Sequence, residues 1–145
     1  MTYFFIALGA LLLWIWFDLF VRTAGLGITA AWPGASGLHP LPTVRVRFNS
    51  IYAKILNSGT SFGAVSIRQT IHVKGGRDTL TPSRLAHEVR HVLRAGEVGT
   101  YRYLWQYLTD SGFAKAEEAE AERYNRAYTH DATIQSAWRR FTGRA

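Results

Sequence analysis

The chain has 145 residues, contains no cysteine and carries a formal net charge of +7. A hydrophobic content of 48% excludes a chain that is disordered by composition, and the length allows one compact domain beside an N-terminal segment. The absence of cysteine excludes disulfides and thiolate metal sites, so any metal ion must be held by His, Asp or Glu. The positive charge favours anionic partners, with lipid preferred, because the chain contains no recognisable nucleic-acid-binding motif.

Residues 3–21 form an apolar stretch that predicts a membrane-anchor helix. The stretch carries one charge, Asp18, near its end, and about 20 apolar residues span the hydrocarbon layer of a bilayer. A signal peptide fits less well because a positively charged start is missing, and a buried core helix would show an amphipathic stripe. Arg22 and later arginines follow the stretch, so the positive-inside rule predicts a single-pass membrane protein with its C-terminal domain in the cytoplasm. Residues 1–24 are therefore assigned to the anchor, and residues 3–21 to contact with membrane lipid.

Residues 25–42 are rich in Gly and Pro and predict a linker, and residues 43–145 predict a single domain. Residues 43–48 alternate between apolar and polar side chains, which predicts a half-buried strand with Arg45 and Arg47 facing solvent. Residues 50–56 are compatible with a second strand or a short helix. Residues 62–67 and 69–74 predict two further strands, ended by a Gly-Gly turn. A small sheet is therefore expected before the central motif of the chain.

That motif is His87-Glu88-x-x-His91. Histidines four residues apart on a helix lie on the same side, so both imidazoles can bind one metal ion, and zinc is the usual ion for nitrogen ligands in an open site. Glu88 occupies the position of the general base in the metallopeptidase motif. The helix is expected to begin at Thr81 as N-cap with Pro82 in its first position, and to end at Gly96.

Three more helices are expected over residues 98–108, 113–128 and 130–141, which completes an α+β fold. The tyrosines of the first of these helices are interpreted mainly as packing residues. A catalytic zinc ion has three protein ligands and one water molecule, so a third ligand must come from elsewhere in the chain. The later candidates are His130 and four glutamates, Glu117, Glu118, Glu120 and Glu122.

With this helix followed by Glu118-Ala-Glu-Ala-Glu122, the chain resembles the gluzincin branch of zinc metallopeptidases over roughly residues 70–128. In that branch a second helix carries a glutamate ligand, often in the pattern Glu-x-x-Ala-Asp or close to it. The resemblance implies that Glu118 is the third ligand and that Glu122 orients a ligand histidine. Glu117 is the second choice for the ligand. The resemblance also implies a zincin-like domain that binds Zn²⁺.

The activity implied by the resemblance is hydrolysis of peptide bonds in a peptide or protein substrate, with Glu88 moving a proton from the zinc-activated water to the leaving amine. The donor to the oxyanion is left open among Tyr124, Arg123, Tyr101 and His130. An edge strand above the motif helix would bind extended peptide, and residues 69–74 are the expected strand. The alternative function is a catalytically silent zincin-fold binding or structural subunit of a membrane or phage assembly. The intact motif favours the enzyme.

Overall fold

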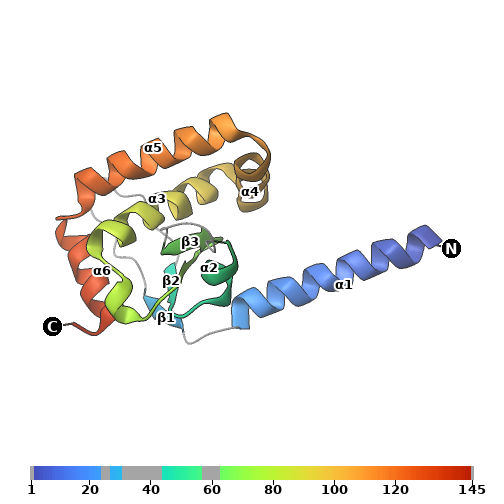
Figure 1. Ribbon diagram of the computed structural model, residues 1–145, viewed down its shortest axis with the longest axis horizontal. Coiled ribbons are helices and arrows are strands. Elements are labelled where there is room, and N and C mark those ends of the chain that lie inside the picture. Colours follow the sequence, from blue (N-terminus) through green and yellow to red (C-terminus); the bar gives the residue numbers. More distant parts are fainter. Residues whose placement is uncertain (1, 24–26, 31–43, 57–62, 145) are drawn as a thin grey trace.

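The computed structural model describes residues 2–23, 27–30, 44–56 and 63–144, and these residues form the expected α+β fold (Figure 1). After the N-terminal helix, the chain forms a small sheet that includes one short helix between its strands. Four further helices follow the sheet. The elements are α1 (Thr2–Thr23), β1 (Gly27–Ala30), β2 (Val44–Arg47), α2 (Ile51–Leu56), β3 (Ala64–Ile67), β4 (Thr70–Val73), a 3₁₀ turn (Arg77–Thr79), α3 (Pro82–Val98), α4 (Thr100–Thr109), α5 (Ser111–Tyr128) and α6 (Ala132–Thr142).

The four strands form one sheet in the order β1-β2-β4-β3. β2 and β4 are parallel, whereas β1 with β2 and β3 with β4 are antiparallel. β4 is therefore paired on both sides, and the expectation that residues 69–74 form the edge strand is wrong. Apolar alternation identifies a strand but not its neighbours, and the tight β3–β4 hairpin folds β4 back between β3 and β2. The edge strand beside β4 is β3.

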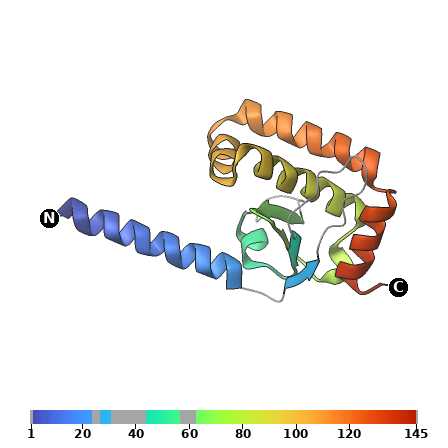
Figure 2. The same ribbon diagram turned by 180° about the vertical axis from the view of Figure 1, so that it is seen from behind.

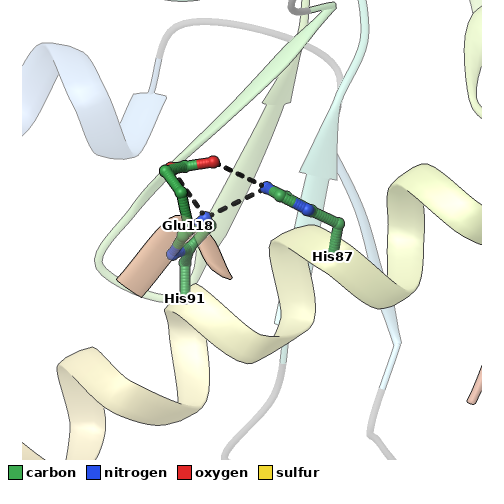
Figure 3. Close-up of side chains that lie close together, drawn as sticks. All are labelled: His87, His91 and Glu118. Carbon is green, nitrogen blue, oxygen red and sulfur yellow. Dashed lines mark hydrogen bonds and ion pairs between the residues drawn. The ribbon is translucent and has the colours of Figure 1, made fainter. Parts of the chain in front are cut away.

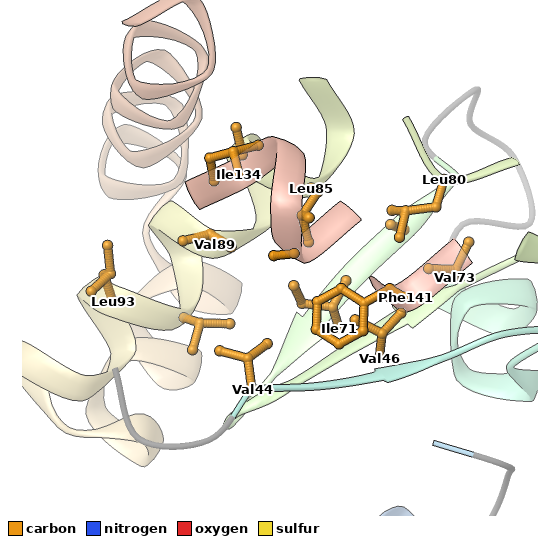
Figure 4. Close-up of a cluster of buried hydrophobic side chains, with 14 residues drawn as sticks. Val44, Val46, Ile71, Val73, Leu80, Leu85, Val89, Leu93, Ile134 and Phe141 are labelled. Carbon is orange, nitrogen blue, oxygen red and sulfur yellow. The ribbon is translucent and has the colours of Figure 1, made fainter. Parts of the chain in front are cut away.

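The register of the sheet assigns its side chains to two faces. Val46 and Ser66 are both paired with Ile71, so all three point to the same face as α3, while the residues on either side of them point away. Apolar side chains of β2 and β4 pack on this face against α3 and α6, with Leu85, Val89 and Phe141 at the centre (Figure 4). The core thus fixes α3 on the sheet.

The motif helix begins as predicted and ends later than predicted. The Thr81 side chain accepts a hydrogen bond from the Arg84 backbone N–H at 3.1 Å, and Pro82 occupies the first turn. The predicted end at Gly96 is wrong, because α3 continues to Val98 and is capped by Gly99. Gly99 has a φ of +94°, which disfavours other residues, whereas a glycine inside a helix costs only about 1 kcal/mol. Packing of α3 against α5 offsets that cost.

Two further expectations for the sheet region are corrected. β1 lies within the predicted linker 25–42 and pairs with β2, since Gly in a short edge strand is tolerated; the rest of that linker lies outside the described residues. Arg47 is buried rather than solvated, because α2 covers the face of the sheet to which it points. Residues 51–56 form a helix, the second of the two alternatives.

The N-terminal helix forms where expected and extends away from the other elements (Figures 1 and 2). Among the helices described in the structure, however, none combines the length and the apolar character needed to cross a membrane. The prediction that residues 3–21 span a bilayer is therefore not supported.

His72 is fully buried on the face of β4 that α2 covers. Its Nδ1 atom lies 2.8 Å from Ser50 Oγ, and the ring of Tyr52 packs edge-on against it. Burial, together with the positive charge of Arg47, lowers the pKa of His72 to about 4. The folded protein thus holds this histidine neutral at pH values where an unfolded chain would protonate it.

Acidification should therefore destabilise the fold through His72. Between pH 6.5 and about 4 the unfolded state binds more protons, so stability decreases as the pH decreases through this window. Lowering the pH from about 8 to about 5 should cost the wild type about 2 kcal/mol more than the His72→Asn variant, which keeps a polar group beside Ser50. Urea unfolding at both pH values measures the difference. Equal losses in the two proteins would show that His72 does not carry this effect.

Candidate metal centre

The centre is formed by α3 and α5, which pack side by side and are connected through α4 (Figures 1 and 2). α3 lies between the sheet and α5, so one side of α3 faces the core and the other faces α5. His87 and His91 lie one turn apart on the side toward α5, and Glu118 reaches them from α5 (Figure 3). The structure thus brings together the two motif histidines and the glutamate that was expected to be the third ligand.

The donor atoms of these three side chains lie close together. The Nε2 atoms of His87 and His91 are 3.2 Å apart. Glu118 Oε2 lies 3.3 Å from His87 Nε2, and Glu118 Oε1 lies 3.3 Å from His91 Nε2. One ligand atom from each residue lies within 4.8 Å of the other two, so the three residues could hold one metal ion.

The charges of the cluster also favour a cation. Hydrogen bonds from His87 and His91 hold the pKa of Glu118 well below its usual range. Burial alone would lower the pKa of His87, but the hydrogen bond to Glu118 and the carboxylates of Glu88, Glu118 and Glu122 raise it overall. A divalent cation placed between the three side chains would be attracted by these carboxylates.

Two tyrosines of α4 hold the ligands, although the sequence indicated only a packing role for them. Tyr103 Oη lies 2.9 Å from His91 Nδ1, and Tyr107 donates a hydrogen bond to the Glu118 carboxylate. When His91 binds a metal through Nε2, its Nδ1–H donates to Tyr103, which fixes the tautomer and the orientation of the ring. Burial raises the pKa of both tyrosines, so both stay neutral. The sequence pattern that could have indicated this role is the spacing of four residues between the two tyrosines, which places both on one face of the helix.

Replacing Tyr103 with Phe should weaken zinc binding by about 10- to 100-fold, because the partner that orients His91 is lost. Competition with a chromogenic chelator measures the dissociation constant. Tyr101→Phe is the matched control, since Tyr101 lies on the same helix and its hydroxyl contacts Arg68 instead of a ligand. Equal zinc affinity in wild type and Tyr103→Phe would exclude the orienting role.

Glu88, the expected base, is buried and extends from α3 to the edge strand β3. Ser66 on β3 donates a hydrogen bond to Glu88 Oε2 at 2.7 Å and another to the Glu88 carbonyl oxygen at 3.0 Å. Burial raises the pKa of Glu88, with the nearby histidines and Ser66 opposing it. No local sequence pattern predicts the contact of Ser66 with Glu88, because only the register of the β3–β4 hairpin turns the Ser66 side chain toward α3.

The other expected glutamates lie at different distances from the centre. Glu122 Oε2 is 3.9 Å from His87 Nδ1, on the correct side to orient that ring but beyond hydrogen-bond length. Glu117 is buried and accepts a hydrogen bond from Arg94 Nε at 3.1 Å, so its carboxylate is engaged away from the two histidines. Of the carboxylates on α5, Glu118 alone joins both histidines in the described part of the chain.

The four candidates for oxyanion donor are not brought to the centre by any contact recorded among the described residues. Tyr124 is stacked on Tyr128 at the margin of the core, with ring centroids 4.4 Å apart. Arg123 is exposed and binds Glu120, and Tyr101 accepts a hydrogen bond from Arg68. His130 is exposed between α5 and α6. Tyr107 and Tyr103 are the hydroxyl groups that contact the ligands.

The centre thus combines three potential metal ligands with the buried carboxylate of Glu88, which lies on the same helix as the two histidines. Such an arrangement can bind a divalent cation and can transfer a proton close to it. Comparison of the chain with models of known protein families, with curated proteins and with solved structures finds no match.

Proposed function

We propose that the protein is a zinc-dependent metallopeptidase. The observation that carries the proposal is the convergence of donor atoms from His87, His91 and Glu118 within 4.8 Å of one another, with Glu88 next to His87 on the same helix. A cluster that only stabilised the fold would have no need for three converging donors together with a buried carboxylate. Zinc with two His and one Glu ligand is an established catalytic combination in peptidases.

Each residue of the centre has a role in this proposal. His87, His91 and Glu118 would hold the zinc ion, which would supply Lewis acidity for a scissile carbonyl and for water. Glu88 accepts the proton of the attacking water and returns it to the leaving amine. Ser66 keeps the Glu88 carboxylate turned toward the β3 side of α3. Tyr103 and Tyr107 fix the orientation of His91 and Glu118.

The edge strand β3 is the expected binding strand for an extended peptide. It is paired on one side with β4 among the described strands, and it contacts the base through Ser66. A peptide that pairs with the other side of β3 would have its backbone held by main-chain hydrogen bonds. The scissile bond would then lie beside α3. β3 replaces residues 69–74 in this role.

The proposal is tested with the full chain and a mixture of quenched fluorescent peptides. We expect one bound zinc ion per chain, cleavage that stops when a chelator removes the metal, and recovery when zinc is returned. Bound zinc without cleavage of any peptide would instead support a silent zincin-fold subunit. The absence of zinc binding would contradict both functions.

A further inference from the structure

The exposed large apolar side chains of the described residues are confined to three helices. They lie on α1, on α2 (Ile51 and Ile55) and on α4 (Tyr101, Trp105 and Leu108). The strands, α3, α5 and α6 contribute none to this group within the described ranges. Single exposed apolar residues are ordinary, but their concentration on a few elements marks an interaction surface.

α4 carries apolar side chains on two opposite faces. Tyr103 and Tyr107 face the metal centre, whereas Tyr101, Trp105 and Leu108 follow one another at intervals of four and three residues on the outer face. Trp105 is 70% exposed and Leu108 is 78% exposed. The outer face therefore carries an apolar stripe that is largely exposed at Trp105 and Leu108.

The three helices lie on the same side of the molecule in both views (Figures 1 and 2). The rings of Trp14 on α1 and Tyr101 on α4 are in contact, with centroids 5.2 Å apart. One residue of the α4 stripe is thus in contact with an exposed aromatic residue of α1. The exposed apolar residues of α1, α2 and α4 on this side of the molecule are here called the apolar surface.

The helices of the apolar surface carry or adjoin charges of both signs, with Asp18 in α1 and Asp110 after α4, but the charged residues of α2 and α4 themselves are basic. α2 and α4 each contain one charged residue, Lys54 and Arg102, and no acidic residue. Arg68 donates a hydrogen bond to Tyr101 at 2.9 Å and lies over its ring. The glutamates of the chain are concentrated on α5 and α3 instead. Exposed Trp, Tyr and aliphatic side chains beside Lys and Arg match the boundary between acyl chains and anionic headgroups.

We infer that the apolar surface docks on an anionic phospholipid bilayer, with the outer stripe of α4 inserted at the level of the headgroups beside α1. The basic side chains remain at the phosphates while the apolar side chains enter the acyl region. A soluble protein partner would not require cationic residues beside the aromatic stripe. This docking requires neither zinc nor catalysis, so it can fail or succeed independently of the proposed peptidase.

Because the chain contains no cysteine, a single introduced cysteine can be labelled selectively to measure the contact between α4 and the bilayer. A single cysteine is introduced as Leu108→Cys in the full chain and labelled with an environment-sensitive fluorophore. The matched control is Ala127→Cys, an exposed position on α5. With vesicles of phosphatidylcholine and phosphatidylserine, we expect a blue shift at position 108 and quenching by spin-labelled lipid, and neither change at position 127.

The result at position 108 decides the proposal. A label that stays as water-exposed in bound vesicles as the label at position 127, or a protein that does not bind vesicles, overturns it. A blue shift at position 108 without vesicles that grows with protein concentration shows that a second copy of the chain covers the stripe, and this also overturns it.

The charge argument is tested with Arg102→Glu in the otherwise unchanged chain. Partitioning into anionic vesicles should fall by about tenfold or more, while partitioning into pure phosphatidylcholine vesicles should change little. Arg126→Glu, an equal charge reversal on exposed α5, is the control and should have a much smaller effect. Equal effects of the two reversals would show that binding responds only to the net charge of the protein. This result would overturn the proposal that the apolar surface faces the bilayer.

Discussion

Replacing Glu88 with Gln should abolish peptide hydrolysis while zinc remains bound. Gln keeps the size and polarity of the side chain, including a partner for Ser66, but it cannot accept the proton of the attacking water. General acid–base catalysis typically contributes a factor of about 10² to 10⁴, so the rate should fall by at least about a hundredfold. Zinc content is measured by elemental analysis and turnover with the peptide that the wild type cleaves best.

The control for this variant is Glu97→Gln on the same helix. Glu97 lies six residues after His91, near the end of α3, where its side chain binds Arg94, so its neutralisation should leave turnover unchanged. Loss of zinc in Glu88→Gln would mean that Glu88 supports the metal site itself. Hydrolysis at the wild-type rate in Glu88→Gln would show that the base has been wrongly assigned.

Replacing Glu118 with Ala should remove most of the bound zinc. Two histidines on one helix would remain, and they lack the charge and the third donor that the tetrahedral set requires. Loss of a residue that merely orients a ligand already weakens metal binding by about 10- to 100-fold, so loss of the ligand should weaken it by more than about 100-fold. The dissociation constant is determined by chelator competition on freshly folded protein.

Two neighbouring glutamates provide controls for Glu118→Ala. Glu122→Ala should have a smaller effect on zinc, because its carboxylate is 3.9 Å from the ring of His87. Glu117→Ala should mainly reduce stability, since Arg94 would lose a partner that is buried in α5. Full zinc occupancy in Glu118→Ala would assign the third ligand to one of these two residues instead.

The features predicted correctly from sequence depend on short-range patterns. His87 and His91 share a helix face because four residues make just over one turn, and Thr81 with Pro82 marks the start of that helix through local hydrogen bonding. β2 follows from strict alternation. Each of these patterns lies within a few neighbouring residues, so it can be recognised without knowing how distant parts of the chain pack.

The features that were missed depend on how distant segments meet. Ser66 contacts Glu88 only because the hairpin turns β3 back along β4 in one register. Tyr103 contacts His91 because α4 crosses beside α3, and no local pattern specifies that crossing. For the same reason the sequence does not show that β4 is paired on both sides. Gly96 does not end α3, because the packing of α3 outweighs the weak helix-ending preference of glycine.

The position of the ligands on α3 and α5 has a consequence for folding. Glu118 follows His91 by 27 residues, and the chain between them contains the whole of α4. An ion bound to both helices would close this segment into a loop, as a covalent cross-link does. Chain-entropy arguments for a cross-link of this span give about 3.5 kcal/mol. Metal binding would therefore stabilise the folded chain as a reversible cross-link between α3 and α5, and withdrawal of the metal would remove this contribution.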